Sequence, residues 1–295
     1  MNSLYRTMLT TRLVEDRLLA MCREGLAGDL HFNRGQEAIA TGVCAALRPT
    51  DRMVCHHRTI AHQIAKGAPL YPLIAEILGK KTGCNGGRAG EMHISNHAIG
   101  HDFSFQLVAT CLPVAVGLAW ALRHRKVDDV VACFFGDAAT SNGAFHEAMT
   151  IASIHRVPLL LVCENNGRAG NVTKEHYLPV ATVAQRMSGY DIRAKTIDGN
   201  NVALVHREAE MMLEDIRRAP RPLLLECKTE RGSPHKIGQG DNRSKEEMAQ
   251  VAELDPLPRE AARTGLSLEQ MADMADEINT SLNEIFERIA KDEVA

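Results

Sequence analysis

The sequence lacks the signatures of a zinc-binding, disulfide-linked or membrane-spanning protein. Its eight cysteines include no CxxC pair, and several lie in apolar, strand-like runs, so reduced core residues are the favoured interpretation. No apolar run approaches the length of a bilayer span, and charged residues come too early for a secretory signal. These absences predict a cytoplasmic protein that has no membrane partner.

Common nucleotide-binding motifs and an excess of positive charge are also missing. The formal net charge of -3 gives no electrostatic basis for a nucleic-acid partner. No GxGxxG run follows a predicted strand, which argues against a nicotinamide or flavin site. The run LGKKTG at 78–83 lacks the glycine at position 74 that a P-loop requires.

What is present is an alternation of strand-like and helix-like segments. With 45% hydrophobic residues among 295, the chain has enough apolar material for a large α/β core. The alternation predicts a parallel sheet flanked by helices on both faces, because crossover helices cover the two faces of such a sheet. We expect a single domain over residues 1–295, with a helical N-terminal extension and a C-terminal helical tail at about 245–295.

Periodicity sets the expected elements. Strands are expected at 130–135, 159–163, 192–197 and 223–227, and helices at 4–22, 36–47, 70–78, 113–125, 143–155 and 202–218. A last amphipathic helix follows Ser267, which forms a capping-box pattern with Gln270, and it carries Leu268 and Ile278 on its apolar side. Two segments lack periodicity: 79–96, expected to be a long binding loop, and 238–257, expected to be a mobile loop and linker.

Two successive predicted strands end in polar residues. VVACFFGDAAT (130–140) places Asp137 after one strand, and PLLLVCENNGRAG (158–170) places Asn166 after the next, 29 positions later. One crossover helix and one returning strand account for this spacing, so both side chains should reach the carboxyl edge of the sheet. A carboxylate, an amide oxygen and loop carbonyls suit Mg2+, and a helix that begins near Asn142 offers N–H groups to a phosphate. The pattern predicts a metal-bridged diphosphate.

Each of these residues also has a simpler interpretation. Asp137 would cap the following helix, and Asn165–Asn166 would form a turn. Two strand ends in register, with a helix start between them, favour the metal site over this alternative. His57 and His62 would similarly be solvated helix surface if no ligand bound near them.

GDAA followed by ENN resembles the thiamine diphosphate motif, in which NN follows GDG after about 30 residues, a crossover length. The chain as a whole resembles the alpha subunit of the thiamine diphosphate-dependent decarboxylating component of 2-oxo acid dehydrogenase complexes, closest to the pyruvate and acetoin branches. The likeness extends from about residue 4 to 245 through ordered blocks, namely RGQEAIATGVCAALRPTDRMV, HHRTIAHQIAKG, GGRAGEMHI, LPVAVGLAWAL and CFFGDAATSNGAFHEAM. It implies the diphosphate-binding half of a thiamine diphosphate-binding fold.

The resemblance implies roles for matching positions. Asp137 and Asn166 would bind Mg2+ through their side chains, and Arg168 through its backbone carbonyl. Val108 would contact the aminopyrimidine ring through its backbone, and His235 would be catalytic, as a proton donor or charge stabiliser. The positions that would contact the diphosphate are His57, Arg58, Gly136, Ala138, Ala139, Arg231 and His235.

The implied activity is cleavage of a 2-oxo acid such as pyruvate, or of acetoin, with the two-carbon unit passed to a lipoyl or other acceptor. In the family, the glutamate that activates the cofactor belongs to a separate beta subunit, so an α2β2 heterotetramer is expected. A lipoyl or acyl-carrier protein would be a further partner. One alternative is a subunit of a split transketolase-like or acyloin-type two-carbon transferase.

Departures from the family pattern bear on this expectation. Ala138 replaces the glycine at the third position of GDG, which motivates another alternative, a scaffolding subunit that no longer binds cofactor. Arg168 replaces an aromatic residue after NN. The segment NHAIGHDFSFQLVATCLP differs from the usual GIVGAQVP near the substrate side, which points to an unusual substrate.

Overall fold

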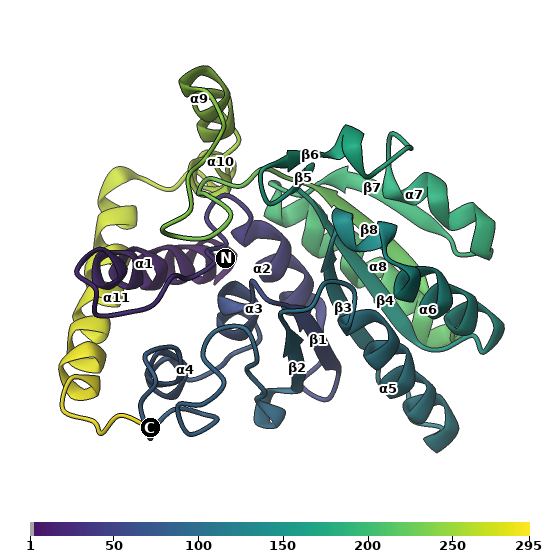
Figure 1. The fold of residues 1–295 in the computed structure, drawn as a ribbon, viewed down its shortest axis with the longest axis horizontal. Helices are drawn as coiled ribbons and strands as arrows, with labels where there is room; N and C mark the ends of the chain where they lie inside the picture. Colours follow the sequence, from purple (N-terminus) through teal and green to yellow (C-terminus); the bar gives the residue numbers. More distant parts are fainter. Residues whose placement is uncertain (1–2) are drawn as a thin grey trace.

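The fold is built on one parallel sheet with helices on both faces (Figure 1). The structure is a computed structural model that describes residues 3–295. Six strands pair in the order β2-β1-β3-β4-β8-β7. Their bounds are β1 Arg52–His56, β2 His101–Phe105, β3 Val131–Gly136, β4 Leu159–Asn165, β7 Ala194–Asp198 and β8 Leu223–Lys228. A separate two-stranded hairpin joins β5 (Arg168–Ala169) to β6 (Val172–Thr173).

The central strands form because nearly every residue in them is apolar and buried. Side chains of β3 alternate between two layers: Val131 and Phe135 pack toward α5 (Cys111–Arg125) and α6 (Gly143–Ile154), whereas Phe134 packs toward α2 (Glu37–Ala46) and α8 (Val202–Arg218). Each fully buried phenylalanine contributes about 1.5–3 kcal/mol of transfer free energy. The sheet is therefore held from both sides, and its strand ends are fixed in position.

A helical layer packs beside the sheet. It contains α1 (Ser3–Arg23), α3 (Ile60–Ala65), α4 (Leu70–Ile77), α10 (Pro256–Thr264) and α11 (Leu268–Ile289). α11 lies alongside α1 (Figure 1) and buries Ile278, Leu282 and Ile289, and Ser267 and Gln270 form the predicted capping box. Leu268, expected on the apolar side, is instead 83% exposed, because it lies at the first position of the helix. Within residues 3–295, no helix is both long and apolar enough to cross a bilayer.

Every predicted strand and helix is present, with ends displaced by a few residues, and the parallel sheet is confirmed. The prediction of a loop and linker at 238–257 is wrong, because α9 (Lys245–Glu253) forms there and Pro256 begins α10. β1 and β2 were not predicted as strands. β2 buries His101 and Ser104 instead of an apolar face, which hides the strand pattern.

Glu226 of β8 connects the strand ends on one side of the sheet. Its carboxylate is fully buried and accepts hydrogen bonds from Asn165 Nδ2 at 2.6 Å and Thr196 Oγ1 at 2.7 Å. It also accepts from the backbone N–H groups of Val183 at 2.9 Å and Ala184 at 3.0 Å, where α7 (Val183–Arg186) begins. One carboxylate thus joins the end of β4, the strand β7 and the start of α7.

Replacing Glu226 with alanine should destabilise the protein strongly, because buried donors lose their acceptor. We expect Glu226→Ala to lower the free energy of unfolding by about 3–5 kcal/mol, measured as a thermal unfolding midpoint lowered by roughly 10 °C. The matched control is Glu210→Ala, which removes an exposed carboxylate of α8 and should change stability by less than about 0.5 kcal/mol. Equal midpoints for the two variants would contradict this assignment.

Candidate active site

A cavity of 370 Å3 opens at the carboxyl edge of the sheet. Segments that follow β1, β2, β3, β4 and β8 form its walls. β2 lies outside β1, and β4 lies on the far side of β3, so the direction of strand addition reverses between β1 and β3. Ligands of α/β sheets bind at such switch points.

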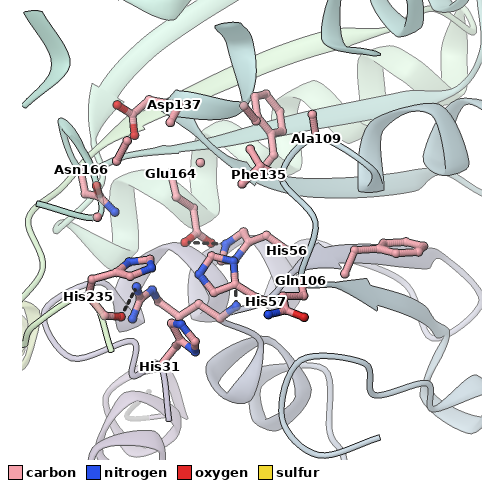
Figure 2. Close-up of a pocket in the computed structure, with 18 of the residues that line it drawn as sticks. His31, His56, His57, Gln106, Ala109, Phe135, Asp137, Glu164, Asn166 and His235 are labelled. Carbon is pink, nitrogen blue, oxygen red and sulfur yellow. Dashed lines mark hydrogen bonds and ion pairs between the residues drawn. The ribbon is translucent and has the colours of Figure 1, made fainter. Parts of the chain in front are cut away.

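The structure brings all the sequence-predicted site residues to this cavity. Its lining includes His57, Arg58, Val108, Gly136, Asp137, Ala138, Ala139, Asn166, Arg168, Arg231 and His235. Figure 2 shows Asp137 and Asn166 on one side of the cavity and His31, His57 and His235 on the other. Their contacts to a cofactor stay predictions, but their convergence is a property of the fold.

Asp137 is a buried carboxylate without a cationic partner. It directly follows Gly136, which pairs with Glu164 across β3 and β4, so Asp137 and Asn166 leave the sheet side by side. Asp137 is 1% exposed, and its Oδ2 accepts a hydrogen bond of 2.5 Å from the Tyr177 hydroxyl. Burial raises the pKa of Asp137 to about 6 despite that hydrogen bond. No salt bridge neutralises it within residues 3–295, which fits a site for a cation.

The loop after β4 is shaped by its two asparagines. Asn165 Oδ1 accepts from the Gly167 N–H at 3.1 Å, which fixes the turn at Gly167, where φ is 67°. Asn166 Oδ1 accepts from the Arg168 N–H at 3.2 Å, and its Nδ2 donates to Gln36 Oε1 at 3.0 Å. This loop carries two of the three predicted metal ligands, the Asn166 side chain and the Arg168 carbonyl.

The side chain of Arg168 turns away from the metal candidates. It forms a salt bridge of 3.0 Å with Glu247 of α9 and donates to Asn242 Oδ1 at 3.3 Å. The side chain is therefore held away from the metal candidates, and the role of the Arg168 carbonyl stays a prediction.

The turn after β3 differs from the expected arrangement in one respect. Asp137–Ser141 forms a 3-10 turn, and Asn142 then caps α6 by accepting from the Ala144 N–H at 2.9 Å. The start of α6 does not line the cavity, so the prediction that this helix presents its N–H groups there is wrong. Ala138 is not among the residues with positive φ, so the change from glycine causes no left-handed strain.

Two buried arginines also line the cavity. Arg58 is 3% exposed and donates to the backbone carbonyls of Phe32 and, at 3.0 Å, His235. Arg231 is 2% exposed and donates from Nη2 to the Gly170 carbonyl at 2.7 Å, while its Nε and Nη1 have no partner. Burial, together with the charge of Arg58, lowers the pKa of Arg231 to about 10. Unpaired, buried N–H groups of a cation fit an anion.

Three histidines lie beside these arginines. The ring centroids of His31, His57 and His235 are 4.6–5.7 Å apart. Burial lowers the pKa of His57, and burial and the charge of Arg58 lower the pKa of His235 to about 4, so both rings are neutral near pH 7. Ligand nitrogens this close could bind a metal ion, but two neighbouring guanidinium groups disfavour a cation here. This side of the cavity is suited to phosphate.

A cluster of Glu164 with two histidines beside the cavity was not predicted from the sequence. Glu164 accepts from His62 Nε2 at 2.6 Å and contacts His56 Nε2 at 3.1 Å. The two imidazoles lower the pKa of Glu164 although burial opposes the shift. His62 is fully buried, so its interpretation as solvated surface is wrong. An available signal was a charged residue at the end of an otherwise apolar strand.

The mouth of the cavity is apolar and open. Leu107 is 74% exposed, Val108 50% and Phe103 40%. Beside them, Ala109 is buried with a φ of 71°, a left-handed conformation that is costly for alanine. Phe103 lies beside Phe105, which lines the cavity, with ring centroids 6.0 Å apart. An exposed apolar rim next to a cavity is typical of a surface that another chain covers.

Comparisons with known proteins agree with this geometry. The family described as "Dehydrogenase E1 component" matches residues 5–293. The alpha subunit of acetoin:2,6-dichlorophenolindophenol oxidoreductase from Bacillus subtilis is 35% identical over 233 residues, which are 79% of this chain and 70% of the relative. The pyruvate dehydrogenase E1 component subunit alpha of Porphyra purpurea is 33% identical over 267 residues, 87% of this chain and 77% of the relative. The 2-oxoisovalerate dehydrogenase subunit alpha of Bacillus subtilis is 30% identical, covering 95% and 88%.

The family match over residues 5–293 and the relatives lead to the same assignment. The chain belongs to the dehydrogenase E1 component family, as an alpha subunit of a thiamine diphosphate-dependent oxidoreductase.

Proposed function

We propose that this chain is the alpha subunit of a heteromeric, Mg2+-dependent dehydrogenase that cleaves a 2-oxo acid or acetoin and passes a two-carbon unit to a lipoyl or other acceptor. One observation supports it most: within residues 3–295, a buried carboxylate without a cationic partner and an arginine with unpaired N–H groups line the same cavity. A divalent cation satisfies the first and a diphosphate the second.

Two groups of lining residues would hold two parts of the cofactor, the metal ion and the diphosphate. Asp137, Asn166 and the Arg168 carbonyl would hold Mg2+, and Arg58 and Arg231 would hold the diphosphate. Bound thiamine diphosphate supplies the nucleophilic carbon and the electron sink for cleavage beside the substrate carbonyl. His57 Nε2 has no partner within residues 3–295 and, in its Nε2–H tautomer, would be a further donor to a phosphate oxygen.

His235 would move or hold a proton beside the substrate. It is half-buried, and the positive charge of Arg58 contributes to its low pKa. A bound diphosphate would offset that charge and return the pKa toward its ordinary value, which brings the imidazole into the range useful for proton transfer near pH 7.

A beta subunit would complete the site. The apolar rim of Phe103, Leu107 and Val108 gives such a chain a surface to cover. The family pattern places the glutamate that activates the cofactor on that subunit. We therefore propose an α2β2 assembly and expect the isolated alpha chain to bind cofactor weakly. The free thiols of all eight cysteines support a reducing, cytoplasmic setting.

The direct test is to co-purify the chain with its beta-type partner. We expect oxidation of pyruvate, acetoin or a branched 2-oxo acid with an artificial electron acceptor, dependent on both thiamine diphosphate and Mg2+. Transfer to an aldehyde acceptor without oxidation would favour the two-carbon transferase instead. The complete absence of saturable cofactor binding would indicate a scaffolding subunit, an alternative that the ordinary φ of Ala138 already weakens.

Asp137→Asn should separate stability from cofactor binding. Because burial raises the pKa of Asp137 to about 6, the folded protein holds a proton more tightly than the unfolded chain. The stability contributed by that protonated form is present at acidic pH and is lost as pH rises through about 6.

Above a pH of about 6 the buried carboxylate is ionised and destabilises the folded protein, and the neutral amide of Asn removes that destabilisation. The cofactor-free variant should gain about 2 kcal/mol at pH 7.5 and little at pH 4, measured by thermal unfolding at both values. Metal-dependent binding of thiamine diphosphate to the assembled complex should disappear. Unchanged cofactor affinity in this variant would remove Asp137 from the metal site.

Arg231→Gln tests the anion side of the cavity. Loss of the buried charge and its unpaired N–H groups should raise the dissociation constant for thiamine diphosphate about 10–100-fold, measured by isothermal titration calorimetry of the complex. The matched control is Arg221→Gln, which removes an exposed arginine from the loop between α8 and β8 and should leave the affinity for thiamine diphosphate unchanged. Equal affinities for the two variants would refute the diphosphate contact.

A further inference from the structure

We propose that Tyr177 is a positioning residue that makes Asp137 a one-oxygen ligand and thereby selects Mg2+ over Ca2+. This inference rests on the proposed function, because it assumes that Asp137 binds the metal. Tyr177 lies outside the GDG and NN segments and 40 residues after Asp137 in the chain.

The structure holds the Tyr177 hydroxyl against Asp137 by several independent contacts. The hydroxyl donates to Oδ2 at 2.5 Å. The Tyr177 N–H donates to the Lys174 carbonyl at 3.1 Å, and its own carbonyl accepts from the Ser141 hydroxyl in the turn after β3. The next residue, Leu178, is buried in the core. The phenol is therefore fixed at both its backbone and its hydroxyl end.

The loop that carries Tyr177 begins at the other proposed ligands. It leaves β4 at Asn166, runs through the β5–β6 hairpin and returns where the Lys174 N–H donates to the Gly167 carbonyl at 2.9 Å. One loop thus supplies Asn166, the Arg168 carbonyl and the phenol that constrains Asp137. Any shift of this loop changes all of these positions together.

The chemistry of the two cations explains the consequence. Mg2+ requires a near-ideal octahedron at about 2.0–2.1 Å, whereas Ca2+ accepts 6–8 oxygens at about 2.3–2.6 Å and often takes both oxygens of one carboxylate. With Oδ2 engaged by the phenol, Oδ1 is the oxygen that Asp137 offers to a metal, and two-oxygen binding is hindered. Hydrogen bonds to a ligating carboxylate also orient it, and their loss typically reduces metal affinity about 10–100-fold.

The test compares Tyr177→Phe with wild type in the complex with the beta-type partner. Mg2+ and Ca2+ are titrated separately into the complex in the presence of thiamine diphosphate, and binding is followed by isothermal titration calorimetry. The matched control is Tyr190→Phe, which removes a hydroxyl that contacts His146 and not the cavity. Thermal unfolding of each metal-free complex shows whether a variant is destabilised.

We expect Tyr177→Phe to weaken Mg2+ binding about 10-fold or more while Ca2+ affinity falls much less, so that the preference for Mg2+ decreases. Tyr190→Phe should keep the wild-type preference. Equal weakening for both cations would show a general loosening of the loop and overturn the proposal, as would unchanged Mg2+ affinity. If the wild-type complex itself binds neither cation saturably, the proposed metal site fails, and this inference fails with it.

Discussion

The parallel pairing of β3 with β4 is the constraint on which the site depends. Because Gly136 lies opposite Glu164, the residues that follow both strands leave the sheet at one edge and in register. The crossover through α6 makes this arrangement nearly obligatory in handedness. Helical layers on both faces fix the strands, so the ends from which Asp137 and the Asn166 loop leave the sheet are set by the core.

The cavity also contains buried charged groups that lack partners of opposite charge in the part of the chain that the structure describes. Among residues 3–295, Asp137 has no cationic partner, and Arg231 has N–H groups without an acceptor. A protein that buried these groups for stability alone would have paired them with each other or with neighbours. Their presence in one cavity fits a ligand that carries both a cation and an anion.

Much of this could be predicted from the sequence because the relevant signals were local. Apolar runs ending at Asp137 and Asn166 identified the central strands and the edge at which they meet. Long-range features were hidden: β2 buries His101, and His62 reaches Glu164 from a different element. Tyr177 was missed because its approach to Asp137 depends on the path of a whole loop. Residues 238–257 were misjudged because polar composition alone does not exclude a surface helix such as α9.

The central claim is that one divalent ion, held at the shared edge of β3 and β4, carries the phosphates of the cofactor. A crystal structure of the complex with thiamine diphosphate and Mn2+, with the metal located by anomalous scattering, tests it most directly. We predict a single strong peak bound by Asp137, Asn166 and the carbonyl of Arg168. A peak among His31, His57 and His235 instead, with Asp137 free of metal, would contradict the account.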